Sequence, residues 1–297
     1  MWQLIALLAY FLLSITGVID KILVSGAIKS PKALVFFISI LSLALFLIAP
    51  LVGLVWVGFN QFIIAVVAGA IFSLALLSYF KAAKDQEISR VIPGIAGFAP
   101  IFTLIFSVNF LGDTFSWIQL LAFVFLVVGG VLITFERNAM QTENMRHLFG
   151  VVLAALLFSI SFILAKAVYN MQPFWSGFMW MRLGGGIFVL LFLLKREWRK
   201  EIFSQARQSP VSGKTLFFSG QAVSSIAFIL QNFAFSLGPV ALVNALESTR
   251  HFFILLLTVI LSKFYPNILR EVVGKGAIIY KVFAIGLIMT GLFLVFN

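Results

Sequence analysis

The sequence predicts an all-α polytopic membrane protein with ten transmembrane helices, arranged as two inverted repeats of five helices. Three observations predict this fold class: the composition, ten long apolar stretches, and a weak duplication between the two halves. Of the 297 residues, 62% are hydrophobic and 10% are charged, whereas a soluble domain has about half and about a quarter. A soluble fold of this composition would expose large apolar patches to water. In a bilayer, the lipid tails solvate such apolar side chains.

Each apolar stretch is long enough to cross a bilayer as a helix, because a span needs ~20 mainly apolar residues. The stretches are continuous rather than alternating, so we expect helices and not the strands of a β-barrel. They run approximately over residues 2–19, 33–52, 61–80, 91–111, 116–135, 148–168, 174–194, 215–236, 240–262 and 274–296.

Most connections between these stretches are short and polar. The longest, residues 195–214, mixes basic residues with Trp198 and Phe203. It is interpreted either as a segment along the lipid headgroups or as a solvated signal that fixes topology. The polar stretch 136–147 lies near the middle, so we expect one five-helix repeat over residues 1–140 and a second over residues 147–297.

The positive charges are distributed asymmetrically along the chain. All but three of the 21 Lys and Arg residues lie in or beside the connections after the first, third, fifth, seventh and ninth stretches; the exceptions are Lys166, Arg182 and Arg250. We expect the chain to cross the inner membrane of the cell several times. Because Lys and Arg stay on the cytoplasmic side, both termini are expected outside the cytoplasm. The charges form no continuous basic face, so nucleic acid is not an expected partner.

Short matches between the two halves indicate a diverged duplication. Residues 14–21 and 159–166 share Ser-Ile-Thr/Ser followed by Lys at an offset of 145, and Gly130 matches Gly291 at an offset of 161. Chance similarity between apolar helices is the alternative. An odd number of helices in each half inverts the second half, and such repeats give two conformations open to opposite sides, with the binding site near the midplane.

The order of several short motifs resembles a known transporter family. The motifs are Ser-Ile-Ser-Phe-Ile-Leu-Ala-Lys at 159–166, Pro173 followed by Arg182, Ala-Pro-Ile-Phe at 99–102, and Leu-Gly-Asp at 111–113. The chain resembles the drug/metabolite transporter superfamily, in particular its ten-helix members with two EamA-type repeats. The resemblance implies a carrier of small molecules.

Ionisable groups inside the predicted spans are the first candidates for a site, because each costs about 2.5–3.5 kcal/mol to insert. Arg182, Glu247 and Arg250 are candidate substrate-binding residues, and Lys166 is expected to extend to the interface. Glu247 and Arg250 share one face of a helix, as a structural salt bridge or as part of the site. The two arginines would hold a carboxylate or phosphate, and Glu247 is also a candidate for binding a coupled proton.

Helix-breaking residues mark a second candidate region. Pro93, Gly94, Gly97 and Pro100 are expected to interrupt the fourth helix, either to line a binding site or as a packed kink. The triplet 184–186 (Gly-Gly-Gly) is expected to allow close helix contact. Further polar candidates near the cavity are Tyr79, Gln231, Asn232 and Asn244.

These features favour a secondary transporter that moves a small anionic or zwitterionic metabolite, such as an amino acid, by alternating access, as a monomer or homodimer. A flippase of lipids or lipid-linked sugars is the alternative. An intramembrane enzyme is disfavoured, because the only histidines are His147 and His251 and no HExxH, GxSxG or P-loop pattern occurs. No cofactor and no metal are expected, and the absence of cysteine excludes thiolate metal sites and disulfides.

Overall fold

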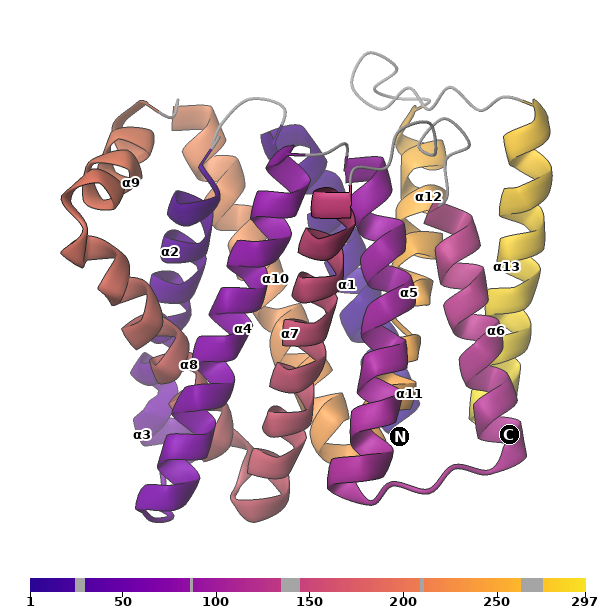
Figure 1. Ribbon diagram of the computed structural model, residues 1–297, viewed down its shortest axis with the longest axis horizontal. Coiled ribbons are helices and arrows are strands. Elements are labelled where there is room, and N and C mark those ends of the chain that lie inside the picture. Colours follow the sequence, from indigo (N-terminus) through magenta and orange to yellow (C-terminus); the bar gives the residue numbers. More distant parts are fainter. Residues whose placement is uncertain (25–29, 86–87, 135–144, 209–210, 263–274) are drawn as a thin grey trace.

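Within the residues that the computed structural model describes (1–24, 30–85, 88–134, 145–208, 211–262 and 275–297), the chain is helical and has no β-strand. The helices lie side by side, and both chain ends are at the same end of the bundle (Figure 1). The elements are α1 (Trp2–Val24), α2 (Pro31–Ser42), the 3-10 helix η1 (Leu43–Ile48), α3 (Ala49–Val52), α4 (Phe59–Asp85), α5 (Ile88–Phe106), the π-helix η2 (Ser107–Leu111), α6 (Trp117–Thr134), α7 (Met145–Met171), α8 (Phe174–Leu190), the 3-10 helix η4 (Leu191–Leu194), α9 (Arg196–Gln208), α10 (Val211–Leu237), α11 (Val240–Ala245), α12 (Ser248–Ser262) and α13 (Lys275–Phe296).

Seven helical segments of the described chain are long and apolar enough to cross a membrane, so the chain is a multi-pass membrane protein. Two further apolar helices, Trp2–Gly17 and Tyr280–Phe296, are shorter. Each of the ten stretches predicted from the sequence coincides, within a few residues, with one helix or a run of consecutive helices. The seven segments are Pro31–Val52, Phe59–Lys84, Val91–Leu111, Trp117–Thr134, Leu148–Met171, Phe174–Leu194 and Val240–Ile260.

α5 is helical through Pro93, Gly94, Gly97 and Pro100, so no unwound interruption lies there, and the packed kink stays a prediction. A transmembrane helix tolerates proline where neighbouring groups bond its carbonyls. The two glycines serve packing instead of flexibility: an added Cβ would lie 2.5 Å from a methyl carbon of α7 at Gly94 and 3.1 Å from one of α6 at Gly97. The break in the described spans lies elsewhere, at Leu246 and Glu247 between α11 and α12.

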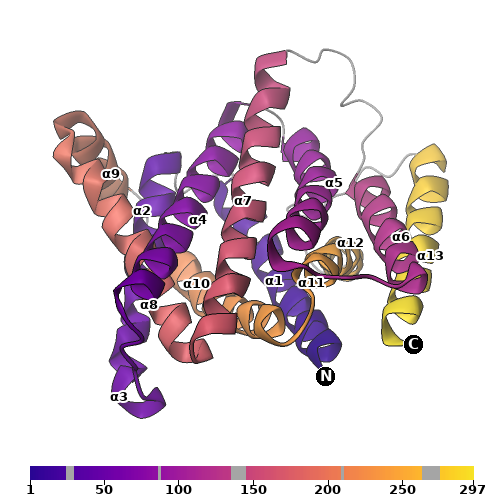
Figure 2. The same cartoon turned by 60° about the horizontal axis from the view of Figure 1, so that its bottom comes forward.

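Neighbouring helices in space come from opposite halves of the sequence. Helix α4 packs against α7 and α8, while α1 packs against α10 and α12. The pair α6 and α13 lies at one edge of the bundle, and α9 lies at the opposite edge (Figure 2). The buried core therefore joins residues that are far apart in the sequence.

The long connection 195–214 contains the helix α9, which packs against α2. Ile202 of α9 is buried there, and Glu201 accepts hydrogen bonds from Ser30 (2.7 Å) and Lys32 (2.8 Å) at the start of α2. Partial burial opposes ionisation of Glu201, but these two hydrogen bonds and the charge of Lys32 outweigh it and lower the pKa of the carboxyl group. Lys32 also lies over the ring of Trp198, 4.9 Å from its centroid.

Candidate functional site

Arg182 lies in α8 and is surrounded by aromatic rings. Its guanidinium carbon is 5.3 Å from the ring centroid of Phe72 in α4, 4.9 Å from that of Phe178 in α8, and 4.5 Å from that of Phe228 in α10. The faces of these rings stabilise the cation electrostatically. Its buried Nε atom has no hydrogen-bond partner, and no carboxylate among the described residues forms an ion pair with it. Within the described part of the chain, Arg182 is therefore a stabilised cation without a counter-ion.

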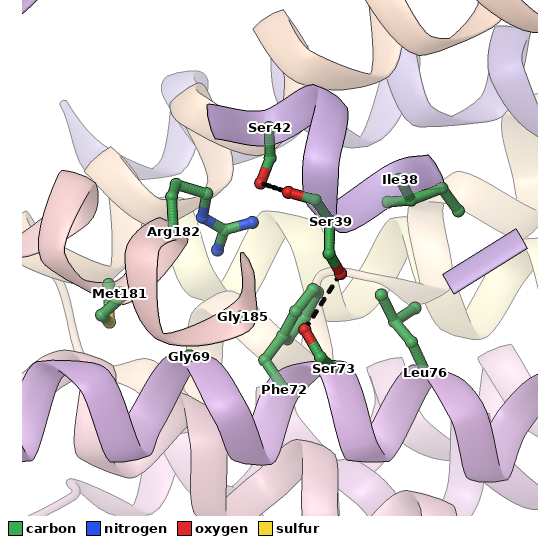
Figure 3. A pocket seen from close by; sticks show the side chains of 10 residues that line it. All are labelled: Ile38, Ser39, Ser42, Gly69, Phe72, Ser73, Leu76, Met181, Arg182 and Gly185. Atoms are coloured by element: carbon green, nitrogen blue, oxygen red, sulfur yellow. Dashed lines mark hydrogen bonds between the residues drawn. The ribbon is translucent and has the colours of Figure 1, made fainter. Parts of the chain in front are cut away.

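A small pocket lies beside this guanidinium, between α2, α4 and α8; we call it the Arg182 pocket (Figure 3). Three hydroxyl groups line it. The hydroxyl oxygens of Ser39 and Ser73 are 3.1 Å apart, and Ser42 donates to the carbonyl oxygen of Ser39 at 2.7 Å. The pocket has room for about one water molecule. It thus combines one cation with hydroxyl groups from two other helices.

Glycines allow the helices around the pocket to approach closely. A Cβ added at Gly69 of α4 would lie 1.7 Å from the carbonyl oxygen of Met181, and one added at Gly184 of α8 would lie 2.0 Å from that of Val66. No side chain fits in either place. The close contact expected of the glycine triplet is confirmed, and it brings α4 and α8 together beside Arg182.

A second polar cluster surrounds the break between α11 and α12. Arg250 and Glu247 form an ion pair of 3.6 Å across this turn, and each side chain is about a quarter exposed. The backbone N–H of Glu247 bonds the carbonyl oxygen of Asn244 at 2.9 Å, three residues back. In a regular α-helix this N–H would bond the carbonyl oxygen of Val243, which is therefore available to another donor.

Tyr10 of α1 bonds that carbonyl group. Its hydroxyl donates to the oxygen of Val243 at 2.9 Å and accepts from the side-chain amide of Gln231 at 3.2 Å. The broken helix is also held from the other side, because the Asn244 amide donates to the hydroxyl of Thr103 in α5 at 2.8 Å. Helices α1, α5 and α10 thus fix the position of the turn.

The remaining predicted residues are distributed around these two clusters. Asn232 accepts from the Tyr169 hydroxyl at 2.8 Å and donates to the carbonyl oxygen of Phe228, whose ring covers Arg182. Tyr79 packs against aromatic rings, including Phe158 at a centroid distance of 6.5 Å, and is not among the residues that line the Arg182 pocket.

Glu247 and Arg250 are not among the residues that line the Arg182 pocket. Among the described residues, no hydrogen bond or ion pair joins Arg182 to the Glu247–Arg250 pair, and α10 contributes residues to both clusters. Lys166 donates to the carbonyl oxygen of Ser236 at 3.1 Å. Sequence reasoning missed the three serines, the aromatic rings and Tyr10, because nothing in their local patterns distinguishes them from other residues of apolar helices.

Comparisons with known proteins show the fold alone. No protein-family model and no curated protein matches the sequence. A solved structure, described only as the crystal structure of a protein, superposes with a TM-score of 0.67 and covers 99% of this chain and 94% of its own. The two sequences are 15% identical. The helical arrangement described above is therefore one that a crystal structure also contains.

Proposed function

We propose that the protein is a secondary transporter that moves a small anionic or zwitterionic metabolite across the inner membrane by alternating access. In this proposal its ten helices form two inverted five-helix halves, similar to the EamA-type members of the drug/metabolite transporter superfamily. The Arg182 pocket binds the substrate. The observation that carries the proposal is the Arg182 cation, which forms no ion pair with any described residue and lies in a pocket lined by residues from both halves of the sequence.

The pattern of helix contacts supports the inverted repeat. If α1, α4, α5 and α6 correspond to α7, α10, α12 and α13, then the contact of α1 with α10 corresponds to that of α7 with α4. The contact of α1 with α12 corresponds in the same way to that of α7 with α5, and α6 pairs with its own counterpart α13. Both chain ends lie at the same end of the bundle, as an even number of crossings requires (Figure 1).

The location and chemistry of the pocket support substrate binding. Ser39 and Ser73 come from the first half and Arg182 from the second, as expected for a site between inverted repeats. A cation inside a span is unfavourable without a partner, so it is retained where it has a function. Because the pocket holds only about one water molecule, a metabolite enters only when α2, α4 and α8 move apart.

The transport test is counterflow in proteoliposomes with amino acids, carboxylates, nucleotide sugars, phosphorylated metabolites and cationic drugs. We expect saturable exchange of at least one anion or zwitterion, reduced about tenfold or more in Arg182→Gln because a charged hydrogen bond is lost. Arg199→Gln, which changes an exposed arginine of α9, is the matched control and should exchange like the unmodified protein. Movement of a labelled lipid without any solute exchange would identify a flippase instead.

Alternating access can be tested directly, because the sequence contains no cysteine and a single introduced thiol has no background. In Ser42→Cys, the thiol replaces a hydroxyl that lines the Arg182 pocket. A membrane-impermeant maleimide should label it from either side of the membrane, and a transported solute should protect it. Labelling from one side alone under all conditions would contradict alternating access.

A further inference from the structure

The Arg182 pocket has an unbalanced chemistry that narrows the class of substrate. Among the residues that line it, Arg182 is the only charged one, and none is a carboxylate. The remaining surface is the three serine hydroxyls together with apolar groups that include Ile38, Leu76 and Met181. The pocket therefore offers a single positive charge beside an apolar wall.

The hydrogen-bonding groups of the pocket include several donors. The planar guanidinium supplies N–H groups and accepts none. Ser39 and Ser73 share one hydrogen between their oxygens, so the hydrogen of the other hydroxyl is free to donate to a ligand. Ser42 already donates to the backbone. A ligand that uses these donors must accept several hydrogen bonds, while the lone pairs left on the serine oxygens can accept from it.

We infer that the substrate is a short monocarboxylate with an apolar body and without an ammonium group. This inference rests on the proposed transport function. The two oxygens of a carboxylate match the fork of a guanidinium and only accept hydrogen bonds. Its single negative charge neutralises Arg182, while the carbon chain contacts Ile38, Leu76 and Met181.

Other anions and zwitterions match the pocket less well. The ammonium group of an amino acid would lie beside a guanidinium, and no carboxylate lines the pocket to balance it. A phosphate monoester carries about −1.5 to −2 charge, so part of this charge would stay uncompensated in an apolar site. The rings around Arg182 hold its guanidinium in place before the ligand arrives, which lowers the entropic cost of binding.

The test compares three solutes of similar size in counterflow: 2-oxobutanoate, 2-aminobutanoate and propyl phosphate. A 2-oxo acid is almost completely ionised at neutral pH and leaks little through lipid. We expect 2-oxobutanoate to exchange about tenfold or more faster than the other two, and Arg182→Gln to lose this exchange. Arg182→Lys keeps the charge without the fork and should retain part of it.

Steric and donor variants provide further readouts if Arg182→Gln does not fold. An added Cβ at Gly185 would lie 2.8 Å from the Ser73 hydroxyl, so Gly185→Ala should slow exchange of the longer 2-oxohexanoate more than that of 2-oxobutanoate. Ser73→Ala should weaken the apparent affinity for 2-oxobutanoate. Arg199→Gln is again the control.

The possible results separate this inference from the proposed function. Exchange of 2-aminobutanoate or propyl phosphate that depends on Arg182, without exchange of 2-oxobutanoate, would leave the transporter proposal intact and overturn the monocarboxylate. Unchanged exchange of 2-oxobutanoate in Arg182→Gln, Ser73→Ala and Gly185→Ala would remove the pocket from the binding site. Absence of exchange for every solute in the wider panel would overturn both proposals.

Discussion

The contact between α4 and α8 at Gly69 leads to a prediction whose magnitude follows from the structure. In Gly69→Ala the new Cβ would lie 1.7 Å from the carbonyl oxygen of Met181, half of the 3.4 Å at which ordinary contact begins. The obstructing atom belongs to the backbone, so no side-chain rotation relieves the clash. The two helices must separate.

We expect this separation to lower the free energy of unfolding by about 3 kcal/mol or more, at the upper end of the effects of overpacking. The assay is thermal unfolding of the purified protein in mild detergent, followed by the loss of a monodisperse peak. Gly184→Ala should behave similarly, because its Cβ would lie 2.0 Å from the carbonyl oxygen of Val66 on the facing helix.

The matched control is Gly286→Ala in α13, where an added Cβ has no neighbour within 4 Å. Replacing glycine by alanine inside a helix stabilises it by roughly 0.5–1 kcal/mol, so this variant should unfold at or slightly above the temperature of the unmodified protein. If Gly69→Ala and Gly286→Ala unfolded at the same temperature, the close backbone contact between α4 and α8 would be refuted.

Three further perturbations test the second cluster and the α9 contact. Tyr10→Phe leaves a buried carbonyl group and a buried amide without their partner, and should destabilise the protein by about 1–3 kcal/mol in the same thermal assay. Glu247→Gln and Arg250→Gln should each destabilise more than the double variant, because each single change leaves one charge unpaired. Lowering the pH should release α9 from α2, measured as faster hydrogen exchange of its amides. The pKa of Glu201 is lowered in the folded protein, so its stabilising contribution is present above its ordinary value of 4.5 and is lost as the pH falls through the lowered pKa.

Each of these predictions has a control or a result that opposes it. Tyr280→Phe changes an exposed tyrosine and should leave stability unchanged. Equal destabilisation in the double variant and in the sum of the single variants would show that Glu247 and Arg250 do not interact. Glu201→Gln should remove the pH dependence of exchange in α9; a dependence that persists in this variant would assign it to another group.

The candidate site could be predicted only in part, and Arg182 shows why. Its position inside an apolar stretch identifies it as costly and therefore as a candidate. Its surroundings could not be predicted, because the rings that cover it are distant in the sequence: Phe72 lies 110 positions before Arg182, and Phe228 lies 46 positions after it. The serines of the pocket have no local signal either, since isolated hydroxyls are common in apolar helices and bond their own backbone.

The local sequence determined which stretches are helical and apolar, because hydropathy and length act within one segment and lipid imposes helices on it. It also indicated that the glycine triplet would permit close packing. Only the tertiary structure decided where a span is broken. Proline and glycine favour a break in α5 locally, yet α5 stays helical where it packs against α7. Tyr10, Gln231 and Thr103 instead supply, from other helices, the hydrogen bonds that stabilise the turn after α11. A break in a membrane helix needs partners for its free backbone groups, and only the folded chain brings those partners together.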